Sequence, residues 1–82
     1  MDLSGAAVLV AGGAGQIGRA VVTALQARGT RVAVTDRLEQ AQTIFAGRDI
    51  LYYPGDAAEE VDCVCVVRKI VETLGSVDAL IN

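Results

Sequence analysis

The residues best suited to chemistry are closely spaced glycines near the start of the chain. Gly13, Gly15 and Gly18 fit the spacing G-x-G-x-x-G, and Gly12 precedes them. Glycines permit a tight turn and let the backbone approach a pyrophosphate, which the free N–H groups and positive end of a following helix can hold. Because a buried-strand pattern precedes this run and a helical pattern follows it, the sequence predicts a dinucleotide-binding turn.

An acid follows this turn near the expected distance of about 20 residues. Asp36 ends a second apolar stretch, where a carboxylate can accept both ribose hydroxyls of an adenosine and would repel a 2′-phosphate. We therefore expect NAD as the cofactor. Arg37 keeps NADP open as the second choice, because an arginine at that place can pair with the phosphate instead.

Short apolar stretches alternate with helical patterns along the whole chain. Strands are expected at residues 6–11, 32–35, 50–53 and 77–82, and helices at 17–28, 38–46 and 59–74. Nearly continuous apolar strands that alternate with helices indicate a parallel sheet covered on both faces. The predicted fold class is α/β, a partial Rossmann-type three-layer parallel sheet, β-α-β-α-β-α-β, with strand order 3-2-1-4.

Two of the predicted helices carry apolar stripes that we expect to face the sheet. The first stripe follows the spacing i, i+3, i+4, i+7, i+8 and consists of Ile17, Ala20, Val21, Ala24 and Leu25. The second stripe consists of Val64, Val67, Val71 and Leu74.

Composition and charge exclude several classes of partner. The 82 residues are 52% hydrophobic with a formal charge of −3, and the seven basic residues are scattered, so we expect no nucleic-acid partner. No apolar run approaches the roughly 20 residues of a membrane span, and no signal peptide is expected. Cys63 and Cys65 fit no metal-binding pattern, which predicts small apolar residues in a reducing cytoplasm and no metal site.

With these residues placed, the chain resembles the N-terminal part of the short-chain dehydrogenase/reductase family over essentially its whole length. Residues 11–18 are similar to the family's T-G-x-x-x-G-x-G loop, except that Ala11 replaces the threonine and Gln16 replaces the middle glycine. Residues 77–82 resemble the strand that leads into the family's N-N-A-G motif, with Asn82 as its first asparagine.

The resemblance implies hydride transfer between a nicotinamide cofactor and an alcohol or ketone. It also implies that Asp56 hydrogen-bonds the adenine amino group and that the catalytic serine, tyrosine and lysine lie beyond Asn82. We therefore assign no catalytic residue and interpret Tyr52 and Tyr53 as packing residues and Lys69 as solvated. The predicted cofactor-binding residues are Gly12, Gly13, Gly15, Gln16, Ile17, Gly18, Asp36, Arg37, Asp56, Ala57 and Asn82.

Residues 1–82 are expected to form a dinucleotide-binding half-domain, truncated within or just after its fourth strand. That strand would be a bare edge needing the missing C-terminal half or another chain, with apolar surface exposed and stability marginal. Two alternatives remain open. One is a non-catalytic NAD-binding or regulatory module. The other is the N-terminal part of an extended-type sugar-nucleotide epimerase or dehydratase, because Gly12, Gly15 and Gly18 also fit G-x-x-G-x-x-G.

Overall fold

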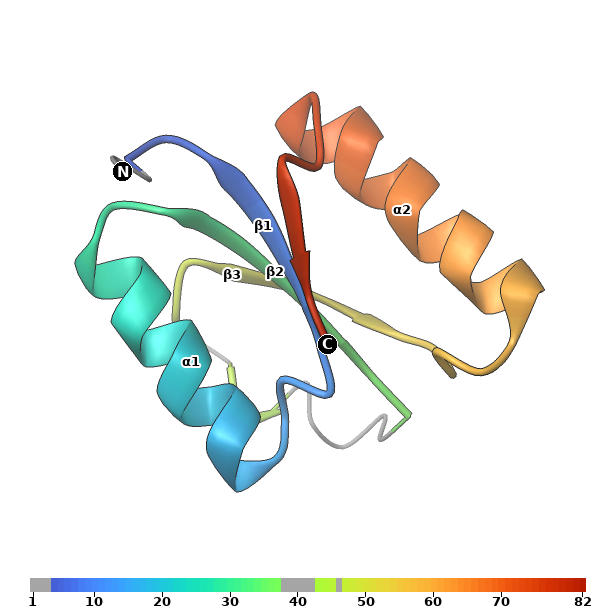
Figure 1. Cartoon of the computed structure of the whole chain (residues 1–82), viewed down its shortest axis with the longest axis horizontal. Helices are drawn as coiled ribbons and strands as arrows, with labels where there is room; N and C mark the ends of the chain where they lie inside the picture. The colour runs from blue at the N-terminus through green and yellow to red at the C-terminus, as the bar shows by residue number, and fades with distance from the viewer. Residues whose placement is uncertain (1–3, 38–42, 46) are drawn as a thin grey trace.

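A four-stranded parallel sheet lies between two helices (Figure 1). The computed structural model describes residues 4–37, 43–45 and 47–82. Its elements in chain order are β1 (Ala7–Ala11), α1 (Gln16–Ala27), β2 (Arg31–Asp36), β3 (Ile50–Pro54), α2 (Glu60–Leu74) and β4 (Ala79–Ile81). The strand order β3-β2-β1-β4 confirms the predicted Rossmann-type topology.

One predicted element, the helix over residues 38–46, lies mostly outside the described residues. Among the described residues, residue 43 has 3₁₀ geometry and residues 44 and 45 form a turn, and the Arg48 amide donates to the Phe45 carbonyl oxygen at 3.1 Å. In the described part of the chain, no helix has both the length and the apolar character needed to cross a membrane.

The central strands are buried on both faces, as their unbroken apolar runs predict. Successive residues of a strand point to opposite faces of the sheet. Val8 and Val10 of β1 therefore join the cluster beneath α1, while Leu9 between them joins the cluster beneath α2. In β2, Val34 packs on the α1 side and Ala33 on the α2 side.

The buried face of α1 differs from the predicted stripe. Val22 and Leu25 are buried, whereas Ile17 is 83% exposed. Ala20 and Ala24 are also exposed, so the prediction that the stripe faces the sheet is wrong for three of its five residues. The difference arises because the buried face begins at Gly18, which packs against the preceding loop. Gly18, Val21, Val22 and Leu25 follow the spacing i, i+3, i+4, i+7, but the first of them has no side chain that would mark the face in the sequence.

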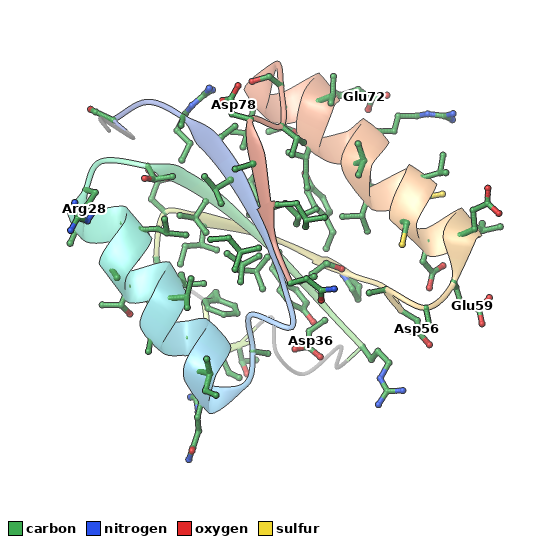
Figure 2. The ribbon with its side chains drawn as sticks, in the orientation of Figure 1. Arg28, Asp36, Asp56, Glu59, Glu72 and Asp78 are labelled. Carbon is green, nitrogen blue, oxygen red and sulfur yellow. The ribbon has the colours of Figure 1, made fainter. Side chains whose placement is uncertain are left out.

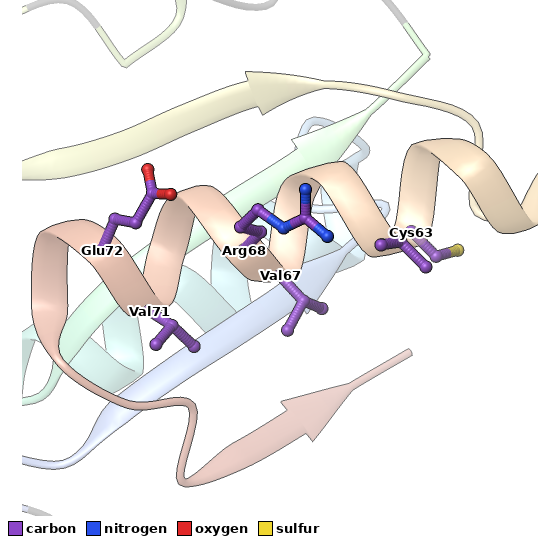
Figure 3. Close-up of a pocket in the computed structure, with 6 residues that line it drawn as sticks. Cys63, Val67, Arg68, Val71 and Glu72 are labelled. Atoms are coloured by element: carbon purple, nitrogen blue, oxygen red, sulfur yellow. The ribbon is translucent and has the colours of Figure 1, made fainter.

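The predicted stripe of α2 is also mostly wrong, because this helix is apolar on two sides. Val66 and Ile70 are buried against the sheet, and Leu74 is partly buried. The stripe residues Val64, Val67 and Val71 are 49%, 41% and 43% exposed. They line an open hollow of about 550 Å³ that also includes Cys63, Arg68 and Glu72 (Figure 3). The expected exposed apolar surface is therefore confirmed.

Strand β4 is short and is held on one side only. It pairs with β1 through Ala79, Leu80 and Ile81 and is an edge of the sheet. Asp78, just before β4, makes two hydrogen bonds to Ala7 at the start of β1. The Asp78 Oδ2 accepts a hydrogen bond from the Ala7 amide at 2.7 Å, and the Asp78 amide donates to the Ala7 carbonyl oxygen at 2.8 Å.

Candidate functional site

Six of the eleven predicted site residues gather where the parallel strands end. A cavity of about 220 Å³ lies at this carboxyl edge. Its lining comprises Ala11, Gly12, Thr35, Asp36, Arg37, Asp56, Ala57 and Asn82. Figure 2 shows Asp36 and Asp56 at this same end of the sheet. Because the strand order reverses between β1 and β4, this is the position at which doubly wound sheets bind ligands.

The glycine turn brings the start of α1 directly against the end of β1. Gly12 has a φ of +78°, a left-handed conformation that favours glycine, and its amide donates to the Thr35 carbonyl oxygen at 2.8 Å. A Cβ on Gly18 would overlap the Gly12 carbonyl oxygen and lie 2.6 Å from the Gly13 Cα. Only a glycine at position 18 allows this close approach of helix to loop.

The N-terminus of α1 is electrostatically suited to an anion. Its N-cap is Gly15, no side chain caps it, and its first turn carries no acid. The first-turn amides and the positive end of the helix dipole are therefore available to a phosphate. In contrast, α2 begins with Glu59 as N-cap and Glu60 and Asp62 in its first turn, so its positive end already faces carboxylates.

The Asp36 carboxylate is fixed from both sides of the site. Its Oδ2 accepts the Ala14 amide of the glycine turn at 3.2 Å, and its Oδ1 accepts the Arg37 amide at 2.7 Å. The Tyr52 hydroxyl donates to the Asp36 carbonyl oxygen at 3.2 Å. Because a carboxylate has about four lone-pair sites, Asp36 keeps acceptor capacity for ligand hydroxyls.

Asp56 is ordered by the first turn of α2. Its Oδ1 accepts the Ala58 amide at 2.9 Å, and its own amide donates to Asp62 Oδ2 at 2.8 Å. The two carboxylates thereby shape the loop between β3 and α2. That loop forms one wall of the cavity at the strand ends.

A second, smaller cavity of about 150 Å³ adjoins the first on the α2 side of the sheet. It shares Ala11, Thr35, Asp56, Ala57 and Asn82 with the first cavity and adds mostly apolar walls from Leu9, Gly55, Asp62, Cys63, Val66, Val67 and Leu80. Thr35 is 7% exposed, and its Oγ1 has no hydrogen-bond partner among the described residues.

The structure sorts the predicted site residues into three groups. Those that line the larger cavity are Gly12, Asp36, Arg37, Asp56, Ala57 and Asn82. Those that shape the turn without lining it are Gly13, Gly15 and Gly18. Gln16 and Ile17 belong to neither group. Gln16 lines a hollow on the outer face of α1, and Ile17 is exposed.

Three polar side chains with a part in the site were missed from the sequence, those of Thr35, Asp62 and Tyr52. Thr35 carries a signal, because it is the polar residue at the end of an apolar strand. Asp62 carries a weaker one as an acid in a helical first turn. Tyr52 carries none, because its contact with the Asp36 backbone depends on strand pairing. Within the described residues, no group of three or more His, Cys, Asp or Glu side chains is placed to hold a metal ion.

Comparison with known proteins gives consistent results for sequence and structure. Residues 6–82 match the model of the family described as short chain dehydrogenase. The chain is 37% identical over 84 residues to the 2,5-dichloro-2,5-cyclohexadiene-1,4-diol dehydrogenase of Sphingobium indicum, a match that covers 99% of this chain and 34% of that protein. It is 38% identical over 85 residues to the cis-2,3-dihydrobiphenyl-2,3-diol dehydrogenase of Paraburkholderia xenovorans, covering 99% of this chain and 30% of that one.

A solved structure agrees with these sequence matches. The 3-ketoacyl-(acyl-carrier-protein) reductase of Brucella melitensis, complexed with NADH, superposes with a TM-score of 0.88 at 25% identity, over 95% of this chain and 33% of that one. The chain thus spans about a third of the length of the relatives it matches.

Proposed function

The chain belongs to the short-chain dehydrogenase family, and from that premise we propose that residues 1–82 are the NAD-binding half-domain of an oxidoreductase. The observation that carries the proposal is the cavity at the carboxyl edge, which joins Gly12, Asp36 and Asp56 beside the uncapped start of α1. Gly12 lines this cavity, and a Cβ on it would meet no protein atom within 4 Å, so the protein backbone lies open to a ligand there and the residues present fit a dinucleotide.

Each part of the cofactor has a matching group in this arrangement. The first-turn amides of α1 would hold the diphosphate, because no carboxylate or capping side chain competes for them. Asp36 would accept hydrogen bonds from the hydroxyls of the adenosine ribose, and Asp56 would accept a hydrogen bond from the adenine amino group. The bound nicotinamide supplies hydride transfer with an alcohol or ketone.

The choice of NAD over NADP rests on the fixed Asp36 carboxylate. A 2′-phosphate would lie beside this negative charge, and the hydrogen bonds to Ala14 and Arg37 hold the carboxylate in place. Arg37 lines the same cavity and would reduce the repulsion without removing it. We therefore propose NAD as the preferred cofactor.

The rest of the enzyme is proposed to cover β4 and the exposed side of α2. Among the described residues β4 is an edge of the sheet, and an edge strand presents unpaired backbone groups. Leu80 on this strand is 62% exposed, and the apolar hollow on α2 adds to the exposed surface. A further segment of a longer chain, or another chain, would pair with the edge and bring the catalytic residues. The cytoplasmic location stays a prediction from the two free cysteines.

Calorimetric titration of NAD, NADP and AMP tests the proposal. The parent chain should bind NAD more tightly than NADP. Asp36→Ala should lose about 10- to 100-fold in NAD affinity, because hydrogen bonds to a charged group contribute about 1.5–3 kcal/mol. Asp36→Asn is the matched control, since it keeps an acceptor oxygen but removes the charge, and it should narrow the gap between NAD and NADP. Equal or tighter NADP binding by the parent chain would overturn the cofactor choice.

A further inference from the structure

A cysteine lies at the rim of the smaller cavity beside the proposed cofactor site. Cys63 is the fourth residue of α2, its thiol is exposed, and its Sγ donates to the Ala57 carbonyl oxygen at 3.3 Å. Ala57 lines both cavities. A group attached to the Cys63 sulfur therefore starts at the wall that the two cavities share.

The smaller cavity has room for a small molecule. Its volume of about 150 Å³ corresponds to roughly five water molecules. Thr35 is one of its lining residues, and the Thr35 hydroxyl is buried and unpartnered among the described residues, whereas such a group ordinarily has a hydrogen-bond partner. A bound molecule that carries a hydrogen-bonding oxygen would satisfy this hydroxyl.

The charges around Cys63 select the kind of molecule. Glu59, Glu60 and Asp62 lie within one helical turn of it, and Asp56 lines the same cavity. Anionic reagents are repelled by this group, whereas neutral ones are not. The remaining walls are mainly apolar, which favours a small uncharged compound.

We propose that Cys63 is a covalent modification site for neutral α,β-unsaturated carbonyl compounds, and that its modification blocks the nucleotide site; the inference rests on the proposed function of that site. In the reaction the Cys63 sulfur adds to the β-carbon of the compound. The new S–C bond forms as the carbon–carbon π bond breaks, and the proton lost by the thiol is replaced by one from water on the α-carbon. No oxidant is required.

Cys65 provides an internal control. It lies two residues further along α2, where neighbouring side chains point to different sides of the helix, and it lines neither cavity. Cys65→Ser leaves Cys63 as the one thiol of the chain, and Cys63→Ser leaves Cys65. Both substitutions are small and exposed, and circular dichroism verifies that each variant is folded.

Both variants are treated with N-ethylmaleimide until intact-protein mass spectrometry shows one adduct per chain. The labelled variants are then titrated with NAD. The Cys63 adduct should lower NAD affinity at least about tenfold, and the Cys65 adduct should leave it unchanged. In a second experiment, NAD is added at ten times its Kd before the maleimide. Bound NAD should slow the labelling of Cys63 about tenfold by occupying the nucleotide site, and should leave the labelling rate of Cys65 unaltered.

The two possible failures are distinguishable. If unmodified chain does not bind NAD, the proposed function itself fails, and this inference fails with it. If unmodified chain binds NAD and the Cys63 adduct binds equally well, or NAD protects neither thiol, the cofactor site stands and the modification site is wrong.

Discussion

Replacing Gly18 with alanine tests the close approach of α1 to the glycine turn. The added Cβ would overlap the Gly12 carbonyl oxygen and lie 2.6 and 2.9 Å from the Gly13 Cα and carbonyl carbon. All three are backbone atoms, so no side chain can turn aside and the helix must shift. Overpacking of this kind costs about 1–3 kcal/mol, which corresponds to a fall in Tm of roughly 5–20 °C for a chain of this size.

Gly15→Ala is the matched control for this prediction. A Cβ at Gly15 would meet the Gly12 carbonyl oxygen at an ordinary 3.6 Å, and its φ of −73° suits alanine. The poorer N-cap is offset by the lower entropy of the unfolded chain, so the net change should stay below about 1 kcal/mol. Thermal unfolding followed by circular dichroism measures both variants. If Gly18→Ala is as stable as the parent chain, the argument for helix–loop contact is refuted.

Three further changes test other parts of the structure. Asp78→Ala removes the acceptor of the Ala7 amide and should lower the free energy of unfolding, measured in urea, by about 1–3 kcal/mol. An unchanged free energy of unfolding would show that strand pairing alone holds β4. Tyr52→Phe removes the hydroxyl that holds the Asp36 backbone and should weaken NAD binding by up to about tenfold in a calorimetric titration; an unchanged affinity would contradict the positioning role. Val71→Lys charges the exposed face of α2 and should reduce self-association in sedimentation velocity with Tm preserved, whereas assembly equal to that of the parent chain would show that this face is not used.

The centre of the sheet was predictable from the sequence because β1 and β2 are buried on both faces. Residues 7–10 are apolar at every position, which is typical of a parallel strand covered on both faces, and the glycines that follow limit the run to the length of a strand. The glycine turn and Asp36 were predictable for a related reason, since their spacing along the chain fixes their places at the ends of adjacent strands.

The helix faces were less accessible to sequence reasoning. On α2, apolar residues cover two sides, and periodicity does not say which side meets this sheet: Val66 and Ile70 do, while Val67 and Val71 remain exposed. On α1, the first contact of the buried face is made by Gly18, which has no apolar side chain to reveal it. Contacts across strands, such as that of Tyr52, depend on register and have no local signal.

The most direct test of the central claim is a comparison of ADP and adenosine by amide NMR on isotope-labelled chain. If the first-turn amides of α1 hold a diphosphate, ADP should shift the amide resonances of residues 12–18, and adenosine, which lacks the diphosphate, should leave them nearly unchanged while still shifting Asp36 and Asp56. Shifts from ADP that fall at the start of α2, or a folded chain whose residues 12–18 respond to neither compound, would contradict the account.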